Sequence, residues 1–180
     1  MSARKLLKPF QLTAVVFVAA LLVVDVAWAQ QKYKLTTSAS AAQSKYVQQH
    51  MIDVGDVPGH QVRIYEIHRT GSELEFSGVK TKESWTRGTS DYVNGTGHTS
   101  GYGIWLLEDG NKVFYRYDGT SQSVIGADGS RKGTYHGVTT IAGGTGKFAI
   151  IRGFLRDVTK FDIQAGYNEL SGEGEYWFEE

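Results

Sequence analysis

Short runs of alternating apolar and polar residues, separated by glycine and polar turns, make up the chain from residue 45 to its end. No stretch there keeps apolar residues at the three- and four-residue spacing of an amphipathic helix over several turns. Aromatic and β-branched residues interrupted by glycine about every ten positions are typical of an antiparallel sandwich or barrel. The pattern predicts an all-β domain over residues 45–180, built as a single small antiparallel barrel of about eight strands. Closure would leave no exposed edge, and an open two-sheet sandwich is the alternative.

The boundaries of the expected strands follow the glycine-rich and polar breaks. The segment Asp109-Gly110-Asn111 between two alternating runs is a strong hairpin signal, because tight turns need residues with positive φ. Residues 30–44 are polar and carry no long apolar period, so we expect them to form a flexible lead-in. The expected strands cover residues 46–54, 61–69, 79–85, 102–108, 112–117, 124–126, 133–141, 148–155, 160–165 and 172–178.

The first 29 residues have the order of a secretory signal peptide. Three basic residues precede an apolar run over 12–24, and Ala27-Trp28-Ala29 supplies the small residues of a cleavage site. The run is shorter than the roughly 20 residues that a membrane span needs. We therefore expect a secreted or periplasmic protein that starts at Gln30 and keeps no membrane anchor. An uncleaved single-pass anchor is the alternative.

Charge and cysteine content narrow the function classes. The leader holds three of the 19 basic residues and one of the 19 acidic residues, which leaves 16 and 18 and a net charge of −2. Such a chain has no basic surface for nucleic acid or an anionic membrane. The absence of cysteine excludes disulfides, thiolate metal sites and cysteine nucleophiles. The remaining length suits one domain that folds without cross-links.

The segment Gly143–Lys147 looks like a nucleotide-binding loop but fails the spacing of both common motifs. A phosphate loop would need glycine at Ile141 and a hydroxyl residue at Phe148. A dinucleotide loop would have to open a helix, whereas the residues that follow are typical of a strand. We expect a structural turn within a sheet, with Phe148 packed in the core.

Strand alternation suggests which carboxylates face the interior. On 61–69, Arg63 and Arg69 share one face, which we expect to be exposed because unpaired arginines are seldom buried. The opposite face would then carry Glu66 and His68 inward. A carboxylate in an apolar interior has a raised pKa and can act as a general acid or base.

The same alternation on 79–85 would turn Glu83 and Trp85 inward. Glu66 and Glu83 are accordingly the candidate catalytic residues. The structural alternative pairs each carboxylate with an interior arginine, such as Arg116 or Arg152, or places it at the barrel rim.

Further candidates for ligand contacts are the ring side chains. The five histidines lack the close spacing of a zinc site, and no metal site is expected. Aromatic residues on the predicted strands can line a cavity or simply fill the core. The candidate ligand-binding residues are His68, Trp85, Tyr102, Tyr115 and Tyr117.

The run Gly137-Val-Thr-Thr-Ile-Ala-Gly-Gly-Thr-Gly-Lys-Phe-Ala-Ile-Ile-Arg-Gly153 resembles a turn-and-strand segment of the allene oxide cyclase-like barrels and the related dirigent proteins. Ile150 departs from the glycine that is common at its position. The resemblance implies an eight-stranded antiparallel barrel with a largely apolar cavity, often assembled as a trimer. It also implies binding or isomerisation of a hydrophobic molecule without a cofactor.

Two functions follow as hypotheses. The first is a secreted barrel that binds a small hydrophobic molecule in its cavity, with a cofactor-free isomerase or cyclase activity left open. The second is a non-catalytic structural or interaction protein with a solid core, whose function lies on loops such as 86–101. The volume of the interior distinguishes them, since ligand cavities usually measure several hundred cubic ångströms.

Overall fold

The computed structural model describes residues 30–127, 130–162 and 164–180, and the expected leader lies outside these ranges. The described residues form an all-β antiparallel structure with two short 3₁₀ helices. In chain order the elements are β1 (Tyr33–Ala39), η1 (Ala41–Gln43), β2 (Ser44–Asp53), β3 (His60–Thr70), β4 (Glu75–Phe76), β5 (Val79–Val93), β6 (Thr96–Leu107), β7 (Lys112–Ile125), β8 (Arg131–Gly144), η2 (Gly146–Phe148), β9 (Ile151–Asp162) and β10 (Tyr167–Phe178).

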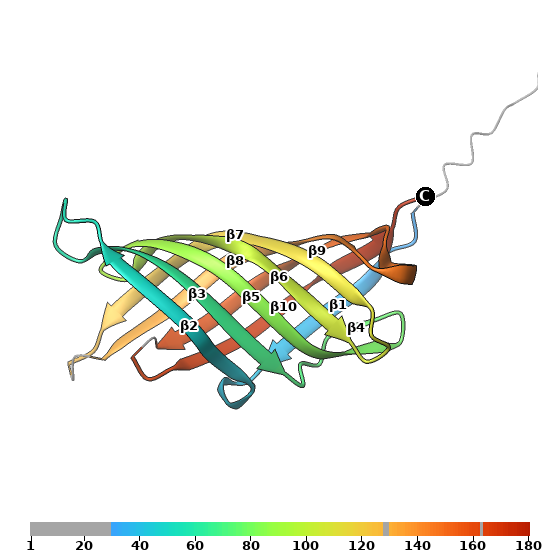
Figure 1. Ribbon diagram of the computed structural model, residues 1–180, viewed down its shortest axis with the longest axis horizontal. Helices are drawn as coiled ribbons and strands as arrows, with labels where there is room; N and C mark the ends of the chain where they lie inside the picture. Colours follow the sequence, from blue (N-terminus) through green and yellow to red (C-terminus); the bar gives the residue numbers. More distant parts are fainter. Residues whose placement is uncertain (1–29, 128–129, 163) are drawn as a thin grey trace, which may run out of the picture.

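One strongly twisted sheet curls around the interior (Figure 1). Its hydrogen-bonded order is β1-β10-β9-β8-β7-β6-β5-β3-β2, and β4 pairs with β5 beside this path. Strands β5 to β10 form a continuous antiparallel meander, in which each strand pairs with the next along the chain. The all-β class and the antiparallel pairing predicted from sequence are therefore confirmed.

The expected closed barrel is not formed, because β1 and β2 remain the two edges of the sheet. The last residue of β1 pairs with Leu170, so the first residues of β10 extend beyond it. There, side chains span the gap in place of backbone bonds. Asn168 on β10 donates to the Tyr46 hydroxyl on β2 at 3.2 Å and accepts a hydrogen bond from Arg69 on β3 at 2.8 Å.

The expected flexible lead-in over residues 30–44 is wrong. It contains β1, which pairs with β10 over its whole length, and the helix η1. Leu35 is buried in the core. Strand formation here depends on a partner far along the chain, since Tyr33 pairs with Tyr176.

The inward face of β3 is the reverse of the predicted one. Arg63, Tyr65 and Arg69 are buried, whereas Ile64 is 62% exposed. On β5 a bulge between Thr81 and Glu83 changes the alternation, so that Ser84 is buried instead of the predicted Glu83. The bulge adds one residue, which turns every following side chain to the other face.

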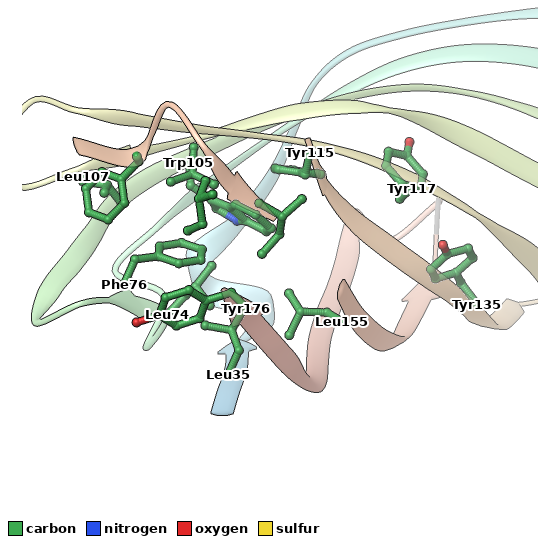
Figure 2. Packing of buried hydrophobic residues seen from close by; sticks show 14 of the residues in the cluster. Leu35, Leu74, Phe76, Trp105, Leu107, Tyr115, Tyr117, Tyr135, Leu155 and Tyr176 are labelled. Atoms are coloured by element: carbon green, nitrogen blue, oxygen red, sulfur yellow. The ribbon is translucent and has the colours of Figure 1, made fainter. Parts of the chain in front are cut away.

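The core divides into an apolar end and a polar half. Figure 2 shows Leu35, Leu74, Phe76, Trp105 and Leu107 gathered at one end, with Tyr117 and Tyr135 farther along the interior. Phe76 packs edge-on against Phe148 and Tyr176, with ring centroids 6.3 and 5.4 Å apart. The buried rings of β4 and η2 therefore fill this end of the curled sheet.

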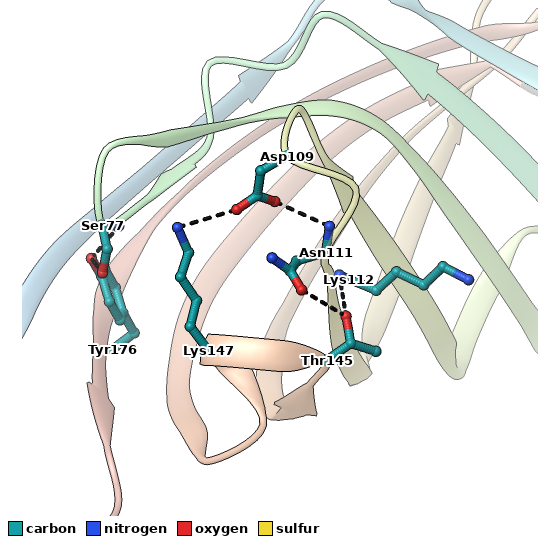
Figure 3. A network of polar contacts seen from close by, with 7 residues as sticks. All are labelled: Ser77, Asp109, Asn111, Lys112, Thr145, Lys147 and Tyr176. Carbon is teal, nitrogen blue, oxygen red and sulfur yellow. Dashed lines mark hydrogen bonds and ion pairs between the residues drawn. The ribbon is translucent and has the colours of Figure 1, made fainter.

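The segment Gly143–Lys147 joins β8 to β9 through η2, as the predicted structural turn requires, and Phe148 is fully buried. Polar contacts tie it to the hairpin between β6 and β7 (Figure 3). Lys147 pairs with Asp109 at 3.1 Å, and the Lys112 amide donates to the Thr145 hydroxyl at 2.9 Å. The Thr145 and Lys147 side chains of this loop therefore make contacts within the fold.

Candidate functional site

The interior of the polar half holds a cavity of about 80 Å³. This is well below the several hundred cubic ångströms of a site for a drug-sized ligand. It is also more polar than the largely apolar cavity expected from sequence, because hydroxyl groups and three charged side chains line it. The charged lining residues are Arg63, Arg69 and Asp157, and the tyrosines among the lining residues include Tyr65, Tyr117 and Tyr135.

Tyrosine hydroxyl groups form a buried hydrogen-bonded chain across this interior. The hydroxyls of Tyr65 and Tyr117 lie 2.7 Å apart, and Tyr65 also contacts the Thr99 hydroxyl at 3.0 Å. Thr99 in turn donates to the Thr89 carbonyl. Burial raises the pKa of Tyr117 far above its usual value, so this phenol stays protonated. The chain holds the rings in place as neutral hydrogen-bonding groups.

Arg69 crosses the interior and is held by neutral partners. Its guanidinium donates to the Thr86 hydroxyl at 2.9 Å and to the Asn168 amide oxygen at 2.8 Å. The Thr86 hydroxyl also contacts the Tyr115 hydroxyl at 2.6 Å. Side chains from β3, β5, β7 and β10 therefore fix the position of one positive charge.

Arg63 is the second buried cation, with only 5% of its surface exposed. Its guanidinium carbon lies 4.6 Å from the Tyr65 ring centroid and 5.7 Å from that of Tyr46. One nitrogen donates to the Gln49 side chain at 3.1 Å. Ring faces and a neutral amide are the contacts that hold this charge.

Asp157 on β9 is the buried carboxylate of the cavity. It accepts a hydrogen bond from the Thr139 hydroxyl on β8. Burial raises the pKa of Asp157 to about 6, although the Thr139 hydrogen bond and the nearby Arg69 charge oppose the shift. A carboxyl group with such a pKa can donate or accept a proton near neutral pH.

Several buried polar atoms around the cavity have no hydrogen-bond partner among the described protein atoms. They include Nε of Arg63, Nε of Arg69 and the Tyr135 hydroxyl. Buried polar groups are nearly always paired, because an unpaired one costs about 1–3 kcal/mol. Three such donors around one cavity mark it as the candidate site.

Two of the sequence-predicted site residues line this cavity, namely Tyr115 and Tyr117. Tyr102 does not, since it lies on the outer face and is 73% exposed. The other predicted residues also lie on the outer face, because the alternation assumed for β3 is reversed and that of β5 shifts at the bulge after Thr81. They are Glu66, His68, Glu83 and Trp85.

The outer-face residues nevertheless come together as one cluster. His68 stacks on Trp85 with ring centroids 4.1 Å apart, and its Nε2 lies 2.7 Å from a Glu83 oxygen. Glu66 pairs with Arg87 at 2.6 Å. The predicted inward position of Glu66 and Glu83 is thus wrong. These contacts test no catalytic role, so that assignment stays a prediction.

Sequence reasoning missed Arg63, Arg69 and Asp157. Arg63 and Arg69 share the alternation of Tyr65 and Ile67 on β3, and Asp157 continues that of Ile151 and Leu155 on β9. The assumption that unpaired arginine is exposed overrode that signal on β3, and Asp157 fell between two expected strands.

No group of three or more histidine and acidic residues within the described ranges is arranged to hold a metal ion. Over the same residues, no helix has the length and apolar character to cross a membrane. No protein-family model, curated protein or solved structure matches the chain.

Proposed function

We propose that the protein binds a small organic molecule inside the curled sheet, at the polar cavity between β3 and β9. The observation that carries the proposal is the set of unpartnered donors around this cavity, from Arg63, Arg69 and Tyr135. A bound molecule with hydrogen-bond acceptors would satisfy them. The tyrosine chain and Asn168 would keep the donors pre-positioned, so that little ordering is needed on binding.

The size of the cavity sets the size of the ligand. A volume of about 80 Å³ has room for about six water-sized groups, given the 10–15 Å³ that each requires. Trp105, Leu155 and Phe161 also line the cavity and offer a surface for a short apolar part. The proposed ligand is therefore small, with one polar end and a compact hydrophobic body.

Ligand-observed NMR against a library of small polar and aromatic molecules tests this function. We expect a subset of compounds to bind to the wild-type protein and to alter its tryptophan fluorescence, because Trp105 lines the cavity. A Thr159→Leu variant, which fills space in the cavity lining, should weaken that binding. A library without any binder would count in favour of the alternative function, a structural or interaction protein with a filled core.

Acid–base catalysis is the second candidate function, and Asp157 favours it. Its raised pKa lets it exchange a proton near neutral pH, and the Tyr135 hydroxyl without a partner lines the same cavity. A cofactor-free isomerase would need such a group beside its substrate. For any turnover found with a bound compound, Asp157→Asn should abolish it while the compound still binds.

Export and assembly are part of the same proposal. The leader predicts cleavage after Ala29, and the resemblance to allene oxide cyclase-like barrels implies a trimer. Mass spectrometry of the protein recovered from a bacterial periplasm should give a chain that begins at Gln30. Light scattering of that sample measures its oligomeric state, and a monomer would remove the trimer from the proposal.

A further inference from the structure

The charges inside the sheet do not balance. Arg63 and Arg69 are both at least nine-tenths buried, and both line the cavity. Neither forms an ion pair with a carboxylate of the described residues, because every hydrogen-bond partner of their guanidinium groups is a neutral amide or hydroxyl. Two buried guanidiniums thus face one interior without a paired counter-charge.

The two cationic groups converge although their residues are six positions apart on β3. Arg69 extends back to Thr86, which pairs with Ile67, and to Asn168, which binds the Tyr46 hydroxyl. Arg63 extends toward the same level from the other side, where it lies over the rings of Tyr65 and Tyr46. Both groups therefore border the part of the cavity beside Tyr46.

Asp157 does not neutralise them. It is the buried carboxylate of the cavity lining, and its hydrogen bond comes from Thr139 rather than from either arginine. Even when it is ionised, the lining carries one more positive than negative charge. A buried guanidinium without a partner is costly, and a carboxylate in bidentate contact is the usual group that offsets the cost.

We propose that the cavity binds a small monocarboxylate, with its carboxylate group between Arg63 and Arg69 and its apolar part toward Trp105. This inference rests on the proposed binding function and names its ligand class. The planar guanidinium fork matches a carboxylate, and each arginine still has a free Nε–H to donate. The aromatic surface beside the polar end favours an organic acid over an inorganic anion.

The test compares matched anionic and neutral ligands on the wild-type protein. Acetate, butyrate and benzoate are titrated beside acetamide, butyramide and benzamide at constant ionic strength, with tryptophan fluorescence and protein NMR shifts as readouts. We expect at least one carboxylate to bind about tenfold or more tightly than its amide, because a charge-assisted bond replaces a neutral one. Chloride serves as the inorganic control and should bind more weakly than that carboxylate.

Variants locate the bound carboxylate. Arg63→Met and Arg69→Met each remove one charge from the cavity and should lower carboxylate affinity by about tenfold or more. Arg156→Met removes an arginine from the exposed outer face of β9 and should leave affinity unchanged. Arg63→Lys keeps the charge without the fork, and we expect intermediate affinity from it.

The outcomes separate this inference from the function on which it rests. Amides that bind as well as their acids would overturn the carboxylate assignment and leave small-molecule binding intact. Equal binding of chloride would likewise overturn it. If none of the six organic compounds binds the wild-type protein, the carboxylate proposal fails, and the library screen decides the wider function. Unchanged affinity in folded Arg63→Met and Arg69→Met would place the acid elsewhere.

Discussion

The ring of Tyr115 on β7 lies over Gly103, its cross-strand neighbour on β6, in the space that a β-carbon would occupy. The same ring stacks on Trp105 with centroids 4.0 Å apart. Tyr117 covers Gly88 and Gly101 in the same way. Glycine thus gives these large side chains room against the inner face of the sheet, where Tyr115 and Tyr117 line the cavity.

We expect Gly103→Ala to lower the free energy of unfolding by about 1–3 kcal/mol, because the new methyl group must displace a buried ring. Urea denaturation measures the change. In a Tyr115→Leu background the same substitution should cost less, since the ring atoms that it meets are gone. Equal costs in the two backgrounds would show that the ring contact is not the reason.

Asp157 predicts an unusual dependence of stability on pH. Its pKa is about 6 in the folded protein against a usual value of 3.8, so the folded state holds an extra proton between these pH values. The free energy of unfolding should therefore fall as pH rises through this window, by about 3 kcal/mol from this group. Asp157→Asn should remove that contribution. Between pH 4 and pH 7.5 the variant should therefore lose less stability than the wild type does.

Urea titrations from pH 4 to pH 7.5 on the wild type and on Asp157→Asn measure this difference. Asp53→Asn, at an exposed position on β2, is the matched control and should keep the wild-type slope. A slope in Asp157→Asn that equals the wild-type slope would contradict the assignment to Asp157.

The two buried arginines should respond differently to removal in ligand-free protein. Arg69→Met leaves the buried Asn168 amide oxygen without its donor and takes one of two partners from the Thr86 hydroxyl, so it should cost about 2–4 kcal/mol. Arg63→Met also removes an unneutralised charge, and its partner Gln49 is exposed. We expect it to change stability by less than about 1 kcal/mol, or to raise it. Thermal unfolding in chloride buffer ranks the two, and the reverse order would contradict this account.

Substitution on the outer face should not affect the cavity. Glu66→Gln breaks a pair with Arg87, whose side chain is 54% exposed, and Glu83→Gln weakens the contact to His68. Such pairs contribute about 0–1 kcal/mol. We expect both variants to keep wild-type affinity for any interior ligand in the fluorescence titration. A loss of ligand affinity in Glu66→Gln would contradict this expectation and support a role for Glu66 in binding.

The sequence predicts the all-β class and many of the strands, but not which face of each strand is buried. Alternation and Asp109-Gly110 predict the hairpin between β6 and β7, although only Gly110 has positive φ, because the turn is a three-residue loop. The β5–β6 hairpin falls in the segment 86–101, which was expected to be a loop, although its turn Asn94-Gly95 has both φ values positive and is a strong hairpin signal. Strand β1 falls in the expected flexible lead-in.

The burial of the site residues depends on contacts between distant strands, which the local sequence pattern does not show. Arg63 and Arg69 are buried because hydroxyl, amide and ring partners come to them from β2, β5 and β10, which are distant in sequence. The bulge between Thr81 and Glu83 is invisible in the alternation of one strand. Open edges at β1 and β2 likewise follow from how the whole sheet curls.

The edge strand β1 also bears on the order in which the chain can fold. Tyr33 pairs with Tyr176, so β1 has no backbone partner until β10 has been synthesised. Contacts between such distant residues slow folding, because a long loop must close before they form. The pairing of β1 with β10 should therefore form late, and until then β1 and the outer edge of β10 carry unpaired backbone groups.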